Sequence, residues 1–396
     1  MPTRRGTLIS LAAAPTLGPI GLLAGCRERT IPYSGAFSHG TWGYTLFANG
    51  KFYGQLGFGD GAIDRPFRVA SVTKMAVAEL GRRLHARGDV DLDSDVSDLI
   101  GVTIRHPNHL QKRITIRHLL SHRSGVRDPD IYWMAHPGDI RELLTNDIWE
   151  SGGQPGVTFR YSNLGYGLAA TAIEAATNER FDHLFTRHIA DPMGLDIGLN
   201  WSGVSAGKRA AGMPGVRNKV VQVDDTDVLI SDQPAILMRE GASLETYTPG
   251  QNGTLFSPQG GLRASLYDMV KLTEIIVLQQ PELWKPTWQW DGIIRPNGPS
   301  EDAHFIAFGE GLYIYPKGPL GRDTVPWVGH HGTAYGINCG TWLRANPNRP
   351  SFFAHAALID NSNLSGMMGH EPNHSRAAWH ALGYGASSLR LLDTAK

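Results

Sequence analysis

The spacing of hydrophobic and polar positions divides the chain into a strand-rich start, a helical middle and a strand-rich end. Near the start, segments 41–47 and 52–58 flank Ala48-Asn49-Gly50-Lys51, and Asn-Gly between such segments is a strong signal for a β-hairpin. A helical stripe then follows, formed by Met75, Ala78, Leu80 and Leu84. This spacing predicts a helix from Ser71 to about Ala86.

The rest of the pattern completes an α+β fold. Further helices are predicted over 114–121, 162–176, 265–278 and 376–382, and strands over 311–315, 324–328, 337–343 and 351–358. Because both chain ends supply strands, we expect one antiparallel sheet completed by both ends and flanked by helices, with a mostly helical insertion. Within a single domain over 41–396, the α/β part then covers about 41–75 and 257–396, and the helical and loop part about 76–256. A cleft where the two parts meet is a usual place for a site.

The composition is that of an ordinary globular protein. Of 396 residues, 41% are hydrophobic, and 37 basic residues balance 37 acidic ones, which gives a formal net charge of zero. The chain is long enough to bury an ample core. Without a basic excess or a Lys/Arg run, the charge pattern does not indicate nucleic-acid binding. We expect a small-molecule or peptide substrate, and the sequence indicates no cofactor and no protein partner.

The first 26 residues have the pattern of an export signal. Arg4 and Arg5 precede an apolar stretch, Leu8–Ala24, that is interrupted by prolines. The arginine pair resembles a twin-arginine signal, and Leu23-Ala24-Gly25-Cys26 resembles the bacterial lipoprotein box, in which the cysteine is lipidated. We expect a periplasmic or cell-surface protein anchored to the membrane through Cys26, with a linker over 27–40. A plain secretory signal is the alternative.

Ser71-Val72-Thr73-Lys74 places a hydroxyl and an amine three positions apart at the predicted start of a helix. Residues i and i+3 share a helix face, so Lys74 can lie against the Ser71 oxygen. A serine hydroxyl needs such a neighbouring base to act as a nucleophile at neutral pH. The same pattern occurs at Ser205-Ala206-Gly207-Lys208 in a loop-like stretch, and Ser71 could instead be a helix N-cap. The assignment therefore depends on the motifs that accompany it.

Three further clusters accompany it. Tyr161-Ser162-Asn163 opens the predicted helix over 162–176, Gly329-His330-His331-Gly332-Thr333 lies on a predicted strand, and the segment 118–125 follows the first helix. With these motifs the chain resembles the serine β-lactamase and penicillin-binding-protein-like hydrolases. The similarity is to the branch that contains class C β-lactamases, D-alanyl-D-alanine carboxypeptidases, D-aminopeptidases and carboxylesterases. The matching stretches follow the order of the family: 67–74, 91–93, 116–125, 161–166, 260–265 and 329–332.

The resemblance implies catalytic roles for three residues. Ser71 would be the nucleophile, and Lys74 would be its base, which requires a lysine pKa lowered by burial or by a nearby positive charge. Tyr161 would act as general acid/base at the leaving group. Whether Lys74, Tyr161 or His330 activates the deacylating water stays open.

The resemblance also implies how substrate is held. The backbone N–H groups of Ser71 and Thr333 would form an oxyanion hole. Gly332, which has no side chain, would let substrate lie against the strand. The substrate-binding set would be Asn163, His330, His331 and Gly332.

One position departs from the β-lactamase pattern. Those enzymes have a lysine in the strand motif that corresponds to Gly329-His330-His331-Gly332. This chain has His330 in place of that lysine, and a histidine is largely neutral at pH 7. The charge that helps to hold a substrate carboxylate is therefore weakened, although Arg263 or His331 could compensate. We expect a serine hydrolase of esters, amides or D-amino peptides. The alternatives are a true β-lactamase or D-alanyl-D-alanine carboxypeptidase and, in a different class, a non-catalytic cell-wall or ligand-binding module of the same fold.

Other motifs lack the context that their chemistry needs. Gly203-Val204-Ser205-Ala206-Gly207 matches the nucleophile elbow, which requires a strand before it and a helix after it. His370-Glu371-Pro372-Asn373-His374 matches a zinc-protease pattern that works only inside a helix, where Pro372 is not tolerated. His118 and His122 are four positions apart, but no carboxylate lies between them. We therefore expect no metal site.

Overall fold

A computed structural model describes residues 42–48, 51–58, 64–217, 220–221, 238–239, 241–290, 307–315, 326–334, 336–346 and 349–360. The export signal with Cys26, the linker, the hairpin turn at Asn49-Gly50, the 370–374 pattern and the helix predicted over 376–382 lie outside these residues.

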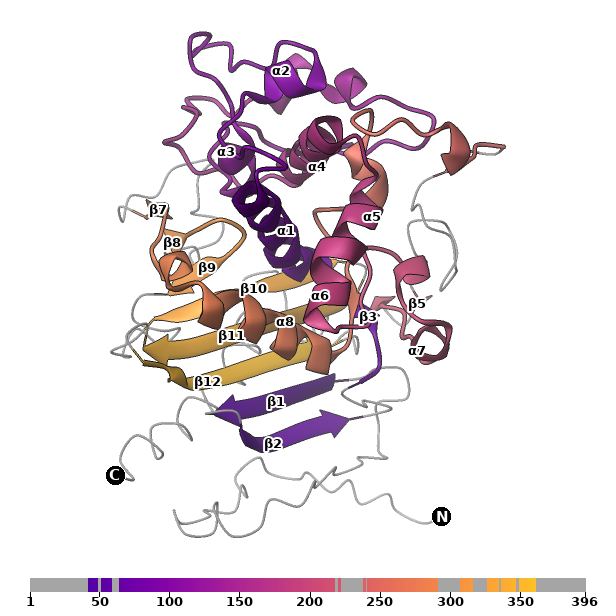
Figure 1. Cartoon of the computed structure of the whole chain (residues 1–396), viewed down its shortest axis with the longest axis vertical. Helices are drawn as coiled ribbons and strands as arrows, with labels where there is room; N and C mark the ends of the chain where they lie inside the picture. Colours follow the sequence, from indigo (N-terminus) through magenta and orange to yellow (C-terminus); the bar gives the residue numbers. More distant parts are fainter. Residues whose placement is uncertain are drawn as a thin grey trace, which may run out of the picture.

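One antiparallel sheet forms the base of the molecule (Figure 1). In the described residues it has eight strands in the order β2-β1-β12-β11-β10-β9-β8-β7. The bounds are β1 Trp42–Ala48, β2 Lys51–Phe58, β7 Trp288–Gln289, β8 Ala307–Phe308, β9 Tyr313–Tyr315, β10 Trp327–Ala334, β11 Ile337–Asn346 and β12 Arg349–Asp360. Two small pairs lie apart from it, formed by β3 Phe67–Arg68 with β6 Arg263–Ala264 and by β4 Val216–Arg217 with β5 Val220–Val221.

The two chain ends meet inside this sheet. Strand β1 pairs with β2 on one side and with β12 on the other, in a register that runs from Trp42 opposite Asp360 to Ala48 opposite Ala354. The predicted α+β class, with a sheet completed by both ends around a helical insertion, is confirmed.

Strand β10 joins two stretches that the sequence predicts separately. The end of the apolar run predicted over 324–328 and the motif 329–333, which is also predicted to lie on a strand, form one strand from Trp327 to Ala334. Glycines lower strand propensity when a sequence is considered alone. Here the close pairing with β11 requires one, because a Cβ at Gly329 would lie 1.9 Å from the Thr341 carbonyl oxygen.

The helices cover one face of the sheet and extend away from it (Figure 1). Helix α8 packs on β11 and β12, α1 contacts β10, and α2 and α3 pack on α4 farther from the sheet. The bounds are α1 Thr73–Arg87, α2 Val96–Ile100, α3 Ile116–Leu120, α4 Asn163–Thr177, α5 Phe181–Phe185, α6 Asp191–Met193, α7 Ala206–Ala210 and α8 Leu266–Gln279. Short 3-10 turns include η1 Ala70–Val72, η2 Ile140–Leu143, η3 Asn146–Ile148, η5 Trp201–Gly203, η6 Leu244–Thr246, η7 Gly253–Phe256 and η8 Pro281–Trp284, and η4 Thr186–Ala190 is a π-helical turn.

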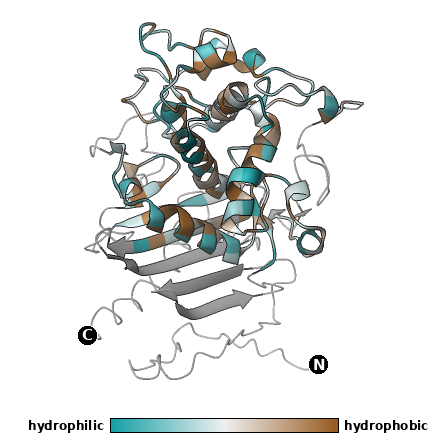
Figure 2. Ribbon diagram, in the orientation of Figure 1, coloured by the Kyte–Doolittle hydropathy of each residue, from teal (hydrophilic) through white to brown (hydrophobic). Residues whose placement is uncertain are grey.

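The ends of the main helices follow capping rules. Helix α1 ends at Gly88, whose φ of 79° is the left-handed conformation that glycine adopts without strain. Helix α8 begins with a capping box in which Ser265 and Asp268 satisfy each other's backbone N–H groups. Hydrophobic and hydrophilic residues alternate around α8 (Figure 2), as expected for a helix with one face on the sheet. Across the described residues, each helix is too short or too polar to cross a bilayer.

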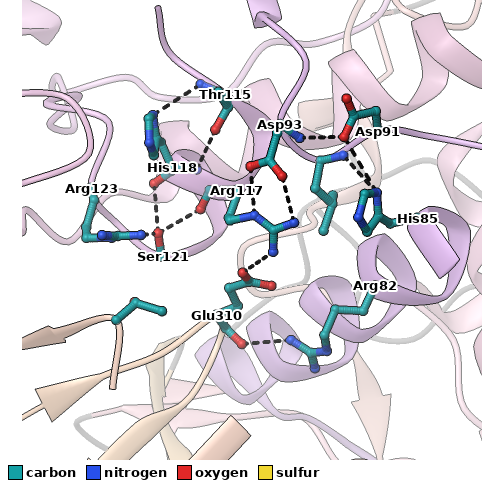
Figure 3. A network of polar contacts seen from close by, with 12 residues as sticks. Arg82, His85, Asp91, Asp93, Thr115, Arg117, His118, Ser121, Arg123 and Glu310 are labelled. Atoms are coloured by element: carbon teal, nitrogen blue, oxygen red, sulfur yellow. Dashed lines mark hydrogen bonds and ion pairs between the residues drawn. The ribbon is translucent and has the colours of Figure 1, made fainter. Parts of the chain in front are cut away.

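An ion-pair network joins the helical part to the turn between β8 and β9 (Figure 3). Arg117 of α3 binds Asp93 through two hydrogen bonds of 2.8 and 3.1 Å and also bonds to the Glu310 carboxylate. Arg82 of α1 donates to the Glu310 carbonyl at 3.0 Å. Two arginines from different helices thus hold the same turn against the start of the helical part.

Candidate active site

Ser71 and Lys74 lie together where the sheet meets the helical part. Ser71 lies in the turn η1, which leads directly into α1. The Lys74 Nζ atom lies 3.0 Å from the Ser71 Oγ atom. Lys74 is fully buried, whereas Ser71 is partly exposed. A partly exposed serine therefore has a buried amine within hydrogen-bond distance of its hydroxyl.

Lys74 is held by two further acceptors. Its Nζ donates to the Asn163 Oδ1 atom at 2.8 Å and to the Gln259 carbonyl oxygen at 2.6 Å. Burial lowers the pKa of Lys74 to about 7, against an opposing effect from the Asp128 carboxylate. Both protonation states are then populated near neutral pH, as a base that also returns its proton requires.

The Tyr161 ring lies beside the Lys74 amine. The Lys74 Nζ atom is 4.8 Å from the centroid of the Tyr161 ring and 5.4 Å from that of Tyr166. The His122 ring packs on Tyr161 with centroids 4.2 Å apart. Burial holds the pKa of His122 well below its usual range, and its Nδ1 atom accepts from the Ser162 backbone N–H at 3.1 Å. His122 is therefore a neutral support for Tyr161.

Strand β10 brings Gly332 against the nucleophile. A Cβ built at Gly332 would lie 2.5 Å from the Val69 carbonyl oxygen and 2.9 Å from the Ser71 backbone nitrogen. The residue before Ser71, Ala70, has a φ of 43°, an uncommon conformation for a residue other than glycine. Thr333 follows Gly332 and is exposed. The strand thus places Gly332, the residue before Thr333, against the backbone of Ser71.

His330 lies on the same face of β10 as Gly332, because side chains alternate along a strand. It is fully buried, its Nδ1 atom lies 2.5 Å from the His331 carbonyl oxygen, and its ring packs on Tyr313. Burial, reinforced by the charge of Lys74 and by His331, holds the pKa of His330 well below its usual range. The imidazole is therefore neutral at pH 7.

The two residues considered as replacements for the missing lysine charge have other partners. The His331 ring stacks on Tyr313 with centroids 4.9 Å apart and lies 5.8 Å from the His330 ring. Arg263 is buried and donates to the carbonyls of Leu199 and Gly261. Neither contact places a positive charge beside Ser71.

Three partners of the site were given no role in it from the sequence. Gln259 contributes a backbone carbonyl, which leaves no signal in residue type. Asp128 is an ordinary loop residue in sequence, and His122 lies in the matching stretch 116–125 but was considered there only as a metal ligand. A φ of 56° at His122 marks a sharp local turn that the sequence does not indicate.

The rejected serine motif and the rejected histidine pair do not form the sites that their patterns resemble. Ser205 is an exposed N-cap of α7 whose hydroxyl bonds to Asp196, and Lys208 pairs with Asp268. A 3-10 turn, not a strand, precedes it, so the nucleophile elbow is absent at this position. The His118 imidazole Nδ1 accepts from the Thr115 N–H rather than facing His122.

One group within the described part of the chain has metal-ligand chemistry. It consists of His85, Asp91 and Asp93, all exposed (Figure 3). The Asp93 carboxylate is already bound by Arg117 through both oxygens. The His85 Nδ1 atom also accepts from the Leu92 N–H. These contacts account for the group without an ion.

Comparison with known proteins places these features in a family context. The family model described as Beta-lactamase matches residues 40–366. D-alanyl-D-alanine-carboxypeptidase/endopeptidase AmpH of Escherichia coli (strain K12) is 27% identical over 142 residues, which cover 34% of this chain and 36% of that protein. The matched region is thus about a third of the length of this curated relative.

Solved structures share the fold. A beta-lactamase/D-alanine carboxypeptidase from Yersinia pestis superposes with a TM-score of 0.57 at 18% identity, covering 82% of this chain and 90% of that one. A D-stereospecific amidohydrolase from Streptomyces sp. superposes with a TM-score of 0.55 at 17% identity, covering 81% and 89%. At these identities the likeness concerns the fold alone.

Proposed function

The chain belongs to the beta-lactamase family, and on this premise we propose that it is a serine hydrolase that works through an acyl-enzyme at Ser71. The observation that carries the proposal is the buried Lys74 amine, which has a pKa of about 7 and lies 3.0 Å from the Ser71 hydroxyl. A non-catalytic relic of the fold would not need this arrangement, because a buried lysine without a chemical role costs stability.

The chemistry follows from the contacts. The Ser71 hydroxyl gives its proton to Lys74 as its oxygen bonds to the substrate carbonyl carbon. The backbone N–H groups of Ser71 and Thr333 stabilise the resulting oxyanion. The proton then passes by way of Tyr161 to the leaving group as the bond to that group breaks. Water attacks the acyl-enzyme, releases the acid and restores Ser71.

Esters, amides or D-amino peptides are the proposed substrates. With a neutral His330 on β10 and with Arg263 directed to backbone carbonyls, a fixed positive charge for a β-lactam carboxylate is not provided by these residues. Hydrolysis of β-lactams or of D-alanyl-D-alanine peptides is the second candidate, supported by the family and by the Escherichia coli relative. A panel of a chromogenic cephalosporin, short-chain nitrophenyl esters and D-alanyl peptides separates the two. Activity on the cephalosporin alone would refute the preference for esters and amides.

A fluorophosphonate probe followed by mass spectrometry tests the nucleophile. We expect one adduct, on the peptide that contains Ser71, and no adduct in Ser71→Ala. Ser205→Ala is the matched control, since Ser205 has the same spacing to a lysine but is an exposed helix cap. An adduct that survives Ser71→Ala, or the absence of any adduct, would overturn the assignment and favour a binding module.

Export and lipidation are proposed from the first 26 residues alone. We propose that Cys26 carries the lipid that anchors the protein outside the cytoplasmic membrane. Radiolabelled palmitate should enter the wild-type protein and not Cys26→Ala. Equal labelling of the two proteins would contradict the anchor.

A further inference from the structure

A carboxylate that the sequence did not single out, Asp128, is linked to the Lys74 amine through the Asn163 side chain. Asp128 is half-buried and accepts three hydrogen bonds from the start of α4. The donors are the Ser162 hydroxyl at 2.9 Å, the Asn163 Nδ2 atom at 2.8 Å and the Leu164 backbone N–H at 2.8 Å. Asp128 therefore binds the same Asn163 side chain that binds Lys74.

These contacts leave the Asn163 amide one orientation. An ionised carboxylate only accepts hydrogen bonds, and a lysine ammonium only donates them. The amide nitrogen must therefore face Asp128 and the amide oxygen must face Lys74, each at 2.8 Å from its partner. A flipped amide would place two donors together on one side and two acceptors together on the other.

The fixed oxygen in turn orients the lysine. A neutral amine has two N–H groups and one lone pair. The Asn163 oxygen and the Gln259 carbonyl oxygen accept the two N–H groups. The lone pair is then left for the third partner of Nζ, the Ser71 hydroxyl. The proton-accepting side of Lys74 is thus set by two acceptors, one of which depends on Asp128.

We propose that Asp128 is a positioning residue for the reaction at Ser71: through the Asn163 amide it aims the Lys74 amine at the nucleophile. This inference rests on the proposed function, because it assigns Asp128 a part in that same site. Asp128 touches neither Ser71 nor the reacting atoms in this arrangement, so its effect passes through Asn163 and through its charge.

The charge of Asp128 gives the inference a second readout. The other titratable groups packed around Lys74 are Tyr161 and Tyr166 of the α4 region, His122 after α3, and His330 of β10. The histidine pKa values are held low and that of Tyr166 is held high, so these three groups are uncharged at neutral pH. Among the described residues, Asp128 is the charged group that raises the pKa of Lys74 against the effect of burial.

The test measures the second-order rate constant of fluorophosphonate labelling at Ser71 between pH 5 and 9. In Asp128→Asn, the new amide at position 128 can hydrogen-bond to the Asn163 amide in either of its two orientations. We therefore expect labelling of Ser71 to slow by about 10-fold or more. The acid limb of the pH profile, in which the labelling rate rises as Lys74 loses its proton, should also move to lower pH. The reason is that the substitution removes the negative charge that raises the pKa of Lys74.

For the double variant that exchanges the two residues, Asp128→Asn with Asn163→Asp, we expect the opposite shift of the acid limb. The carboxylate at position 163 then accepts directly from Lys74, and the amide at position 128 donates to it. We expect much of the labelling rate to return, with the acid limb moved above that of the wild type. If the exchanged pair does not fold, Asp128→Asn is measured in an Asn163→Ala background, where it should add little to the loss.

Asp139→Asn is the matched control. Asp139 lies on the same loop, caps the turn η2 and has no contact with α4 in its hydrogen bonds to Glu142 and Arg141. A wild-type rate and an unshifted acid limb in Asp128→Asn would overturn the inference. The inference would also be overturned if Asp128→Asn labelled more slowly with an unshifted acid limb and a lower melting temperature. That combination would indicate that Asp128 has only a structural role. Failure of the wild-type protein to label at Ser71 would instead overturn the proposed function.

Discussion

Gly332 lies so close to Ser71 that a single methyl group cannot be added between them. A Cβ at Gly332 would lie 2.9 Å from the Ser71 backbone nitrogen and 2.5 Å from the Val69 carbonyl oxygen. Both atoms belong to the backbone, which cannot move aside as a flexible side chain does. The separation of β10 from the turn η1 is therefore set at contact distance.

Gly332→Ala should reduce labelling of Ser71 and turnover by about 100-fold or more, because it pushes the oxyanion-hole strand away from the nucleophile. The measurement is the fluorophosphonate labelling rate together with the melting temperature. Gly207→Ala is the control, since a Cβ there meets nothing within 4 Å. Wild-type labelling by Gly332→Ala would show that the strand does not define the site.

Lys74 should impose a pH dependence on acylation. Its neutral form is the base, and with a pKa of about 7 the labelling rate should rise through neutral pH and level off above it. Lys74→Met should abolish the increase of labelling with pH and most of the labelling rate. Lys208→Met removes the other lysine that lies three positions after a serine in this motif, and it should leave both quantities unchanged. A flat wild-type profile between pH 5.5 and 8.5 would contradict a lysine base.

His330→Ala should change the choice of substrate more than the reactivity of Ser71. The imidazole is neutral, and its Nε2 atom is buried without a hydrogen-bond partner among the described residues. Relative rates on nitrophenyl esters and D-alanyl peptides should therefore change while labelling of Ser71 persists. If His330→Ala is as inactive as Ser71→Ala, the histidine takes part in the chemistry.

Glu174 should be a strong determinant of stability away from the site. It is buried in α4 and accepts from the Tyr247 hydroxyl at 2.6 Å, the Phe181 N–H at 2.8 Å and the Gly250 N–H at 3.1 Å. Glu174→Ala leaves these buried donors without an acceptor, so we expect the free energy of unfolding to fall by about 3 kcal/mol. In Glu179→Ala, which breaks a solvent-exposed ion pair with Arg187, the fall should be about 1 kcal/mol or less. Equal losses in a denaturant titration would contradict the role of Glu174.

Local signals predicted most of the elements. The helices α1, α3, α4 and α8 were expected from hydrophobic spacing and from start and stop residues, and each begins and ends within a few residues of the prediction. The glycines of β10 are a particular case, since they lower strand propensity and the close pairing of Gly329 with β11 is a tertiary contact. A propensity read from the sequence cannot include that contact.

The sequence by itself determined the pairing of Ser71 with Lys74, because residues three apart at a helix start face the same way wherever the helix lies. Only the tertiary structure decided what surrounds that pair. Asp128 is one of 37 acidic residues, and nothing local separates it from the others. The Gln259 contact uses a carbonyl that every residue has. Their roles arise because burial of Lys74 requires every proton on its amine to find an acceptor, and those acceptors come from segments far apart in the chain.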